Sequence, residues 1–440
     1  MINRNIYPHL VSWKQKNRAP LLIRGARQVG KSYIIQKFGE EEFRNTLTIN
    51  FELRPDLIPV FESLDPDAII SQLQLLFRET IDTTTLLFFD EIQECPQAIR
   101  SLRYFKENRP DLFIIGAGSL LEFAFLSDMR MPVGRIQFLN LYPLSFYEFL
   151  LAIGEDQMVI WLRTVELGME IPSAVHEKIL SLLRRYLILG GMPEVIASFS
   201  GDLDLLQASY IQDALIETFK RDFGKYSRSI GSPYLHKVFD AIPRMVGDQI
   251  KFVNIDRDSR SRDLKLAMEL LTLARVITRI SCTDASGLPL GSSLSNRQKY
   301  LFLDVGLMQH ICGIEADILK KAEIIQINRG SVAEQYVGQE LLANADPNLS
   351  TDLFFWARDK PGSSSEVDYC IARGSRIYPV EVKSGKTGRL RSLRVFLEEK
   401  ESPFGIRFWE GGLSFHDNIL SVPLYMTGEL DRLLQSMPGY

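Results

Sequence analysis

The 440-residue sequence contains few residues that hold metals or cross-links, and its apolar runs are short. Its four cysteines and five histidines are scattered without metal-ligand spacing, which argues against a zinc site and favours reduced thiols in a cytoplasmic protein. No apolar run approaches the length that crosses a bilayer, and Met1–Asn5 lacks the apolar core of a signal peptide. We therefore expect no membrane partner. The cysteines are Cys95, Cys282, Cys312 and Cys370.

The chain also lacks an excess of charge of either sign, internal repeats and a low-complexity tail. Its formal net charge is -4, with 24% charged and 45% hydrophobic residues, which is ordinary for a globular protein. The overall charge gives no sign of a nucleic-acid or acidic-membrane partner, so any basic surface must be local. The length exceeds that of one ordinary core, so we expect several domains.

A glycine-rich loop follows the apolar residues Leu21–Ile23 and fits the phosphate-loop pattern of two glycines, a lysine and a hydroxyl. Glycines let backbone N–H groups turn inward toward phosphate oxygens, and a helix N-terminus adds partial positive charge. We expect Lys31 to reach the β- and γ-phosphates and Ser32 to ligate Mg²⁺. The sequence thus predicts binding of ATP or GTP. The loop residues are Gly25, Ala26, Arg27, Gln28, Val29, Gly30, Lys31 and Ser32.

An acidic pair, Asp90 and Glu91, ends the apolar run Thr85–Phe89. A run without alternation is typical of a buried parallel strand, and its end lies at the sheet edge where ligands bind. We expect Asp90 to hold Mg²⁺ through water and Glu91 to orient or deprotonate the attacking water. A strand that ends in a solvated acidic turn is the alternative. The phosphate loop upstream favours the catalytic interpretation, which includes hydrolysis as well as binding.

Alternating strands and helices over residues 1–150 predict a parallel P-loop sheet with helices on both faces. Further strands are expected at 46–51 and 112–115. Ser119 follows the second of these and either contacts the γ-phosphate or its water, or caps the next helix.

Residues 151–230 are expected to form a helical lid or connector, and residues 231–320 a winged-helix-like module. In that module we expect helices at 236–246 and 262–274, an extended segment at 251–255 and a strand at 276–280. Pro243 is expected to kink or end the first helix. The module either contacts DNA or serves as a connector, because its basic residues are diluted by acidic ones.

A second candidate site lies within residues 321–440, where two strand-like segments flank Gly374 and Ser375. If these two residues form a tight hairpin loop, Asp368 lies directly opposite Glu381, with their Cβ atoms about 5 Å apart. Facing carboxylates destabilise a strand pair unless something compensates, and Mg²⁺ or Mn²⁺ would do so.

Lys383 shares the face of Glu381, so it could position a water or stabilise a phosphate. This Asp…Glu-x-Lys arrangement is typical of the restriction-endonuclease-like nuclease fold. A preceding helix at 331–343 offers Glu334 as the first choice of an additional acid and Glu340 as the second. A hairpin with ordinary surface charges is the alternative. The basic residues around the hairpin are Arg373, Arg376, Lys386, Arg389, Arg391 and Arg394.

The chain resembles bacterial and archaeal AAA-type ATPases that carry a C-terminal domain of unknown function with a restriction-endonuclease-like fold. The resemblance implies ATP rather than GTP, and a winged-helix linker. Ser32 stands where many members have Thr, and either hydroxyl can ligate Mg²⁺. The matching stretches are 25–32, 89–93, 118–119, 132–135, 142–146, 190–194 and 303–307, with the set Asp368, Glu381 and Lys383.

Arg135, in the matching stretch 132–135, is the best candidate for an arginine finger or sensor, since a guanidinium near the γ-phosphate stabilises the charge of the transition state. A structural salt bridge is the alternative. If Arg135 acts in trans, the protein must form an oligomer.

Together these observations predict a cytoplasmic ATPase whose nuclease-like domain acts on or near DNA. The alternative is an ATP-switched binding or scaffold protein with an inactive nuclease-like domain and a protein or nucleic-acid partner. A DNA motor is a weaker third hypothesis, because the chain carries a single nucleotide motif.

Overall fold

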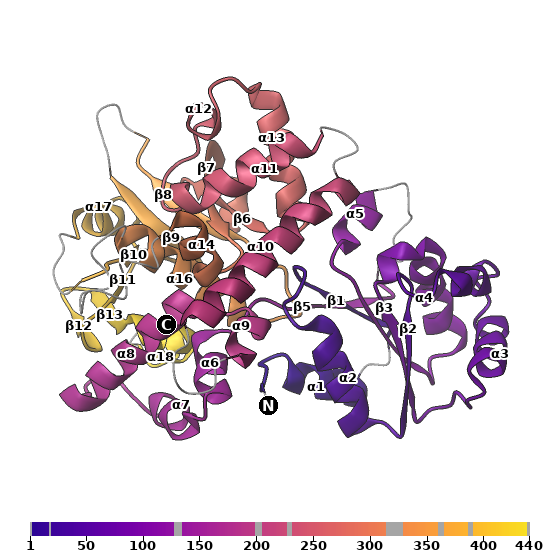
Figure 1. Cartoon of the computed structure of the whole chain (residues 1–440). Coiled ribbons are helices and arrows are strands. Elements are labelled where there is room, and N and C mark those ends of the chain that lie inside the picture. The colour runs from indigo at the N-terminus through magenta and orange to yellow at the C-terminus, as the bar shows by residue number, and fades with distance from the viewer. Residues whose placement is uncertain are drawn as a thin grey trace.

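The computed structural model describes residues 2–16, 19–126, 134–198, 205–226, 231–313, 329–359, 365–385 and 390–437. Pro132, Val133, Lys386 and Arg389, named above, lie outside these ranges. Two β-sheets with helices around them form an α/β structure (Figure 1). Over the same ranges, no helix has both the length and the apolar character that crossing a membrane requires.

The first sheet is parallel, with five strands in the order β2-β3-β4-β1-β5. This confirms the expected P-loop core, including the strands expected at 46–51 and 112–115. The bounds are β1 (Leu21–Arg24), β2 (Asn45–Asn50), β3 (Thr85–Asp90), β4 (Phe113–Ala117) and β5 (Gln137–Asn140).

Helices cover both faces of this sheet, so alternate side chains of one strand enter two different cores. Leu86 and Phe88 of β3 pack in the core that includes Phe38, whereas Leu87 and Phe89 pack in the core that includes Leu102. Burial on both faces explains why the run shows no polar alternation. The elements of this unit are α1 (Tyr7–Lys16), α2 (Lys31–Glu42), η1 (Pro55–Phe61), α3 (Pro66–Phe77), η2 (Ile92–Glu94), α4 (Pro96–Asn108) and α5 (Leu121–Leu126).

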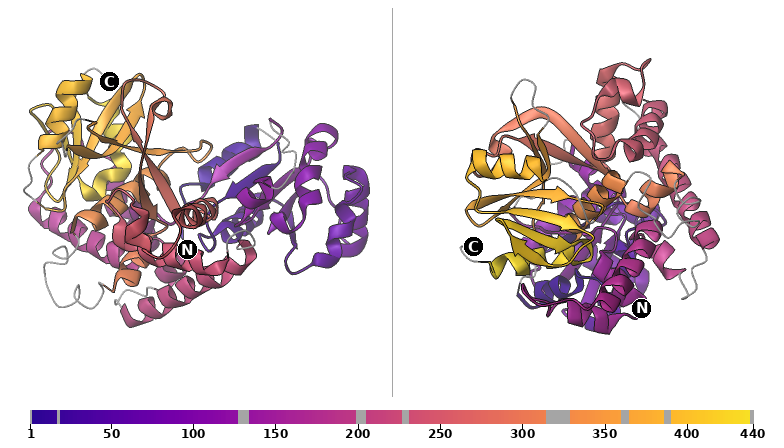
Figure 2. Two further views of the ribbon diagram at one scale, coloured as in Figure 1. Left: turned by 90° about the horizontal axis from the view of Figure 1, so that it is seen from above. Right: turned by 90° about the vertical axis from the view of Figure 1, so that its left-hand side faces the viewer.

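The middle of the chain is helical, as expected. Its longest helix, α10, runs along one side of the molecule, from the C-terminal unit toward the first sheet (Figures 1 and 2). The elements are α6 (Phe146–Ala152), α7 (Asp156–Leu162), α8 (Ser173–Leu189), α9 (Pro193–Ala197), α10 (Leu205–Tyr226), α11 (Ser232–Ala241), η4 (Ile242–Met245), α12 (Phe252–Ile255), α13 (Ser261–Leu273) and α14 (Val305–Cys312).

Two local expectations for this region are corrected or sharpened. The extended segment expected at 251–255 is wrong, because Phe252–Ile255 forms the helical turn α12. Ile250 donates its backbone N–H to the carbonyl of Gln298, and the next backbone N–H groups bond locally, from Asn254 to Lys251 and from Asp256 to Phe252, as in a helical turn. Helix α11 ends at Ala241, and a 3₁₀ turn containing Pro243 follows it.

The second sheet is mixed, with eight strands in the order β12-β13-β11-β10-β9-β8-β6-β7. Strand β6 pairs with β7 on one side and with β8 on the other. The strand expected at 276–280 therefore belongs to the C-terminal sheet, which extends across the expected boundary at residue 320, and the expected domain bounds stay predictions. An independent winged helix is not shown.

The remaining elements complete this unit around the buried helix α16, which Figure 1 shows in brown close to the sheet. They are β6 (Ile277–Thr283), η5 (Leu290–Ser292), β7 (Leu294–Phe302), α16 (Arg329–Ala343), β8 (Leu353–Ala357), β9 (Glu366–Arg373), β10 (Arg376–Val382), α17 (Arg391–Lys400), β11 (Gly405–Trp409), β12 (Ser414–His416), β13 (Ile419–Pro423), η6 (Leu424–Glu429) and α18 (Leu430–Gln435).

A buried ion pair fixes the N-terminal segment to the phosphate loop and to helix α6. Arg4 Nε lies 3.0 Å from Glu148 Oε1, and both side chains are 4% exposed. Arg4 Nη1 also donates to the carbonyl of Val29 at 2.9 Å. Glu148 in turn accepts the backbone N–H of Ser145 at 2.8 Å, completing a capping box at the start of α6.

Replacing Glu148 with alanine is expected to destabilise the protein by about 3–5 kcal/mol, because it leaves the Arg4 guanidinium buried without its counter-charge. Chemical denaturation followed by circular dichroism measures the loss. Glu155→Ala is the matched control, because it removes the pair with the half-exposed Lys178 and should cost only about 0–1 kcal/mol. Equal losses in the two variants would contradict the prediction.

Candidate nucleotide site and acidic cluster

The phosphate loop connects the carboxyl end of β1 to the amino end of α2. Gly30 caps α2 with a φ of +94°, in the left-handed region that favours glycine. A Cβ added to Gly25 would lie 2.3 Å from the carbonyl oxygen of Leu141, so a side chain does not fit there. Both glycines are therefore needed for the turn that forms an anion nest at the start of α2.

Lys31 is buried under this loop. Its ammonium donates to the carbonyls of Gly25 at 3.0 Å and Ala26 at 2.7 Å. Burial lowers the pKa of Lys31 to about 8, although Glu91 and Asp90 oppose the shift. The loop thus holds a cation where a nucleotide would place its phosphates.

Asp90 ends β3 beside the loop, and both of its oxygens accept hydrogen bonds. Ser32 Oγ donates to Oδ1 at 3.0 Å, and Asn50 Nδ2 donates to Oδ2 at 3.0 Å. Burial raises the pKa of Asp90. The adjacent oxygens of Ser32 and Asp90 are of the hard type that Mg²⁺ prefers, so these residues fit the ion.

Sequence reasoning missed Asn50. It pairs with Asp90 in the parallel register of β2 and β3, so it ends its strand at the same sheet edge. The sequence did contain a signal for it, because Asn50 is a polar residue at the carboxyl end of an expected strand, where ligands bind in parallel sheets.

Glu91 adopts a left-handed backbone conformation, with φ 48° and ψ 44°, that is uncommon for a residue with a side chain. Gln93 Nε2 donates to Glu91 Oε2 at 2.7 Å. Gln93 also packs against Gly118, where an added Cβ would lie 1.9 Å from its Oε1. The Gln93 amide therefore ties the acidic turn to the end of β4, the segment that carries Ser119. Both roles of Ser119 stay predictions.

The structure does not bring Arg135 to the phosphate loop of its own chain. Gln137 pairs with Leu21 at the start of β1 and β5, whereas the phosphate loop follows the other end of β1. Arg135 therefore lies at the amino edge of the sheet, where it forms an ion pair with Glu107 at the end of α4. This is the salt-bridge alternative, and a contact with ATP in cis is not supported.

Helix α10 contacts the nucleotide site through charged side chains. Arg27 of the loop forms an ion pair with Asp222. Lys225, one turn further along α10, lies 2.9 Å from Glu52. These contacts place the middle helices beside the phosphate loop and give them a route to respond to its occupancy.

In the C-terminal sheet, the hairpin register expected from the Gly374–Ser375 turn is confirmed. Arg373 pairs with Arg376, and the ladder continues to Tyr369 opposite Val380, one pair before Asp368 and Glu381. The acids are held by neighbouring groups: Asp368 Oδ2 accepts the N–H of Val382 at 2.7 Å, and Lys383 Nζ lies 2.5 Å from Glu381 Oε1. Glu381 Oε2 is buried without a partner.

A second lysine, Lys299 of β7, enters the same cluster and was missed by sequence reasoning. It is 1% exposed, and its Nζ lies 3.2 Å from Glu334 Oε1 and 2.5 Å from Glu366 Oε1. Burial and then Asp368 raise the pKa of Glu334 to about 8 and that of Glu381 to about 7. Burial also raises the pKa of Asp368, although this residue keeps some exposed surface.

Glu334, the first choice for the additional acid, joins this acidic cluster. Glu340, the second choice, has another role: it accepts the N–H of Phe146 at 2.7 Å and that of Asn344 Nδ2 at 3.1 Å. Burial raises the pKa of Glu340 to about 8. Its carboxyl group links helix α16 to the start of α6.

The cluster does not fit the expected second metal. Within the described parts of the chain, no group of three or more His, Cys, Asp or Glu side chains could hold a metal ion. Lysines are bonded to Glu334 and Glu381 instead. The basic flank is also partly neutralised, since Arg373 pairs with Asp431 at 2.6 Å and Arg394 with Asp417 at 3.5 Å.

Comparison with known families agrees with the geometry of the first site. Residues 17–150 match the family described as an AAA domain. Residues 180–318 and 329–425 match two domains of unknown function, DUF8612 and DUF4143. The first part of the chain is thus an AAA-type P-loop domain, which supports ATP binding and ATPase activity. The restriction-endonuclease-like fold of the C-terminal unit stays a prediction.

Solved structures include P-loop ATPases of low similarity. A Walker-type ATPase of Pyrococcus abyssi is 15% identical, with a TM-score of 0.46, over 71% of this chain and 96% of that one. The RuvB Holliday junction branch migration motor of Thermotoga maritima is 14% identical, with a TM-score of 0.29, over 67% and 93%. AMPPCP-bound DnaA of Aquifex aeolicus is 13% identical, with a TM-score of 0.29, over 61% and 87%. No curated protein matches the sequence.

The pKa of Lys31 predicts how ATP affinity depends on pH. Bound phosphates favour the charged ammonium, which the free protein loses near pH 8. Affinity should therefore fall as pH rises above 8, by up to about tenfold per unit. Titration of a non-hydrolysable ATP analogue by calorimetry at pH 7.5 and 9.5 measures this. Lys31→Arg, which keeps its charge, should bind with little pH dependence, and a flat profile for the unaltered protein would contradict the prediction.

Proposed function

We propose that the chain hydrolyses ATP with Mg²⁺ and uses the cycle to switch its C-terminal unit. The observation that carries the proposal is the convergence of Lys31, Ser32, Asp90 and Glu91 at one edge of the parallel sheet. Ser32 and Asp90 would hold Mg²⁺, which neutralises phosphate charge when bound.

The residues of the site support an in-line hydrolysis. Lys31 would release the loop carbonyls and bind phosphate oxygens, stabilising negative charge at the β- and γ-phosphates. Glu91, fixed by Gln93, would accept a proton from the attacking water as the new oxygen–phosphorus bond forms. The bond from the γ-phosphorus to its bridging oxygen breaks, and ADP leaves with the electron pair.

Glu91→Gln is expected to slow phosphate release by about 10²–10⁴-fold with little change in ATP affinity, because only proton acceptance is lost. Phosphate release and calorimetry measure the two effects. Glu94→Gln, an exposed acid three residues on, is the matched control and should hydrolyse ATP at the unaltered rate. A Glu91→Gln variant with unchanged turnover would sink this assignment.

For the C-terminal unit, we propose an ATP-switched binding function that does not involve cleavage. Lys299 and Lys383 supply the positive charge that facing carboxylates require, so the acidic cluster is compensated without a metal. The partner is proposed to be DNA or a DNA-associated protein.

DNA cleavage is the second candidate function. It is favoured by the confirmed hairpin register and by the unpartnered Oε2 of Glu381. Linear, circular and single-stranded DNA, incubated with Mg²⁺ or Mn²⁺ and with or without ATP, tests it.

We expect no cleavage above background in this assay. Cleavage that Asp368→Ala abolishes and Lys31→Ala preserves would overturn that expectation and establish a nuclease. Lys31→Ala serves as the control because it removes ATP binding and leaves the C-terminal cluster intact.

A further inference from the structure

Arg275 is an arginine outside the first sheet that lines a cavity together with Ala26 of the phosphate loop. It lies between the end of α13 at Leu273 and the start of β6 at Ile277. Its φ of 58° is in the left-handed region, which is uncommon for a residue with a side chain. Such conformations persist where the surrounding structure fixes them, and they cluster at functional sites.

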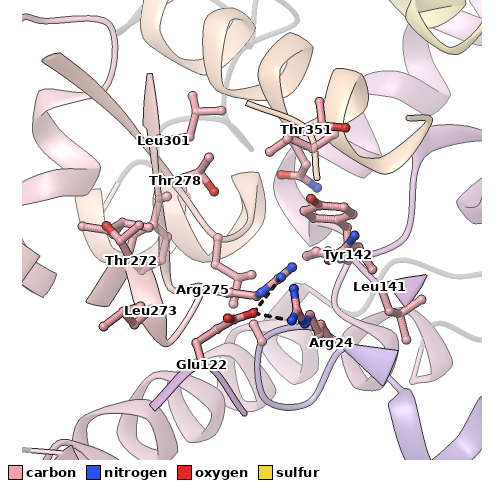
Figure 3. A pocket seen from close by; sticks show the side chains of 18 of the residues that line it. Arg24, Glu122, Leu141, Tyr142, Thr272, Leu273, Arg275, Thr278, Leu301 and Thr351 are labelled. Atoms are coloured by element: carbon pink, nitrogen blue, oxygen red, sulfur yellow. Dashed lines mark hydrogen bonds and ion pairs between the residues drawn. The ribbon is translucent and has the colours of Figure 1, made fainter. Parts of the chain in front are cut away.

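The Arg275 guanidinium shares one carboxylate with a second arginine. Arg275 Nη2 lies 3.1 Å from Glu122 Oε1, and Arg24 Nε lies 3.5 Å from the same oxygen (Figure 3). Arg24 also stacks on the ring of Phe138, 3.6 Å from its centroid. Two cations and one anion leave a net positive charge, although Arg275 also interacts with the side chain of Tyr142. This positive charge attracts an incoming anion, which can compete with Glu122 for Arg275.

A cavity of about 280 Å³ lies beside these groups, and one residue of the phosphate loop, Ala26, borders it. Arg275, Glu122 and Arg24 line it together with Ala26, whose carbonyl accepts from Lys31. Figure 3 shows the guanidinium groups of Arg24 and Arg275 next to each other, both turned toward Glu122. One water occupies about 30 Å³ of liquid, so the cavity has room for a phosphoryl group.

The electrostatics of Lys31 agree with this proximity. Burial is the main cause of its lowered pKa, and Arg275 lowers the pKa further. Two cations that repel each other in the resting protein are suited to binding a highly charged anion between them.

We propose that Arg275 leaves Glu122 and contacts the terminal phosphate of ATP bound to the same chain, stabilising the charge that develops during hydrolysis. A guanidinium in this position raises the turnover rate of other ATPases and GTPases by about 10³–10⁵-fold. The assignment rests on the proposed ATPase function and gives Arg275 the role first expected of Arg135.

Arg275→Gln and Arg275→Lys test the assignment in the full-length chain. Turnover should fall by at least about 10²-fold, with ATP affinity changed less than about tenfold and an unaltered thermal unfolding midpoint. The affinity for ADP with aluminium fluoride, which mimics the transition state, should fall by far more than the affinity for a non-hydrolysable ATP analogue. A merely structural arginine would not separate these two affinities.

Arg279→Gln is the matched control, because Arg279 is an exposed arginine on β6 four residues after Arg275. This variant should keep the unaltered turnover. Glu122→Gln releases Arg275 and should tighten ATP binding severalfold. Unchanged turnover in Arg275→Gln, or equal losses in Arg275→Gln and Arg279→Gln, would overturn the proposal. If the unaltered chain releases no more phosphate than Lys31→Met, the ATPase function itself fails, and the Arg275 assignment fails with it.

Discussion

Helix α16 runs through the interior with four buried polar side chains, and the need to give each a partner constrains the structure around it. Gln335 bonds both backbone groups of Phe302 at the end of β7, and Gln339 accepts the N–H of Val305 at the start of α14. Glu334 bonds Lys299, and Glu340 bonds the N–H of Phe146 at the start of α6. A buried group left unpaired would cost about 1–3 kcal/mol, so the helix fixes three neighbouring segments, β7, α14 and α6, in one arrangement.

This arrangement links the two sites through rigid elements. Glu340 of α16 bonds the start of α6, and Glu148 caps the same helix. The partner of Glu148, Arg4, donates to Val29, so a chain of bonded groups joins the phosphate loop to α16. Strand β6 starts two residues after Arg275, and its Ile280 pairs with Lys299. The nucleotide site and the acidic cluster are therefore connected along one helix and one hairpin, a contiguous path of packed elements.

The parts predicted well from the sequence depend on local patterns. The phosphate loop needs its glycines and Lys31 at fixed spacing, and the run ending in Asp90 is apolar because helices cover both sides of β3. The register of the β9–β10 hairpin followed from the Gly374–Ser375 turn alone. These features require only neighbouring residues, so a single sequence contains them.

The features that escaped prediction depend on packing between distant segments. Lys299 and Arg275 have no local signature, and their partners Glu334 and Glu122 lie 35 and 153 positions away in sequence. Arg135 has a suitable side chain, but the parallel order of the sheet puts it at the edge away from the phosphate loop of its own chain, and a role in trans stays a prediction. Residues 251–255 have an apolar pattern that suits a strand, yet they form the helical turn α12 beside the edge strand β7.

The parallel pairing of β6 with β8 has a consequence for how the chain folds during synthesis. All five strands of the ATPase core have been synthesised by residue 140, so this core can bury the apolar faces of its sheet early. The β6–β7 hairpin must instead wait, with one edge unpaired, until β8 emerges about fifty residues later. The capping box of helix α6 can form as soon as Glu148 is synthesised, whereas its hydrogen bond to Glu340 must wait for helix α16. The ATPase core is thus synthesised before helix α16, which bonds to the start of α6. Strand edges that stay unpaired in that interval are a natural target for chaperones.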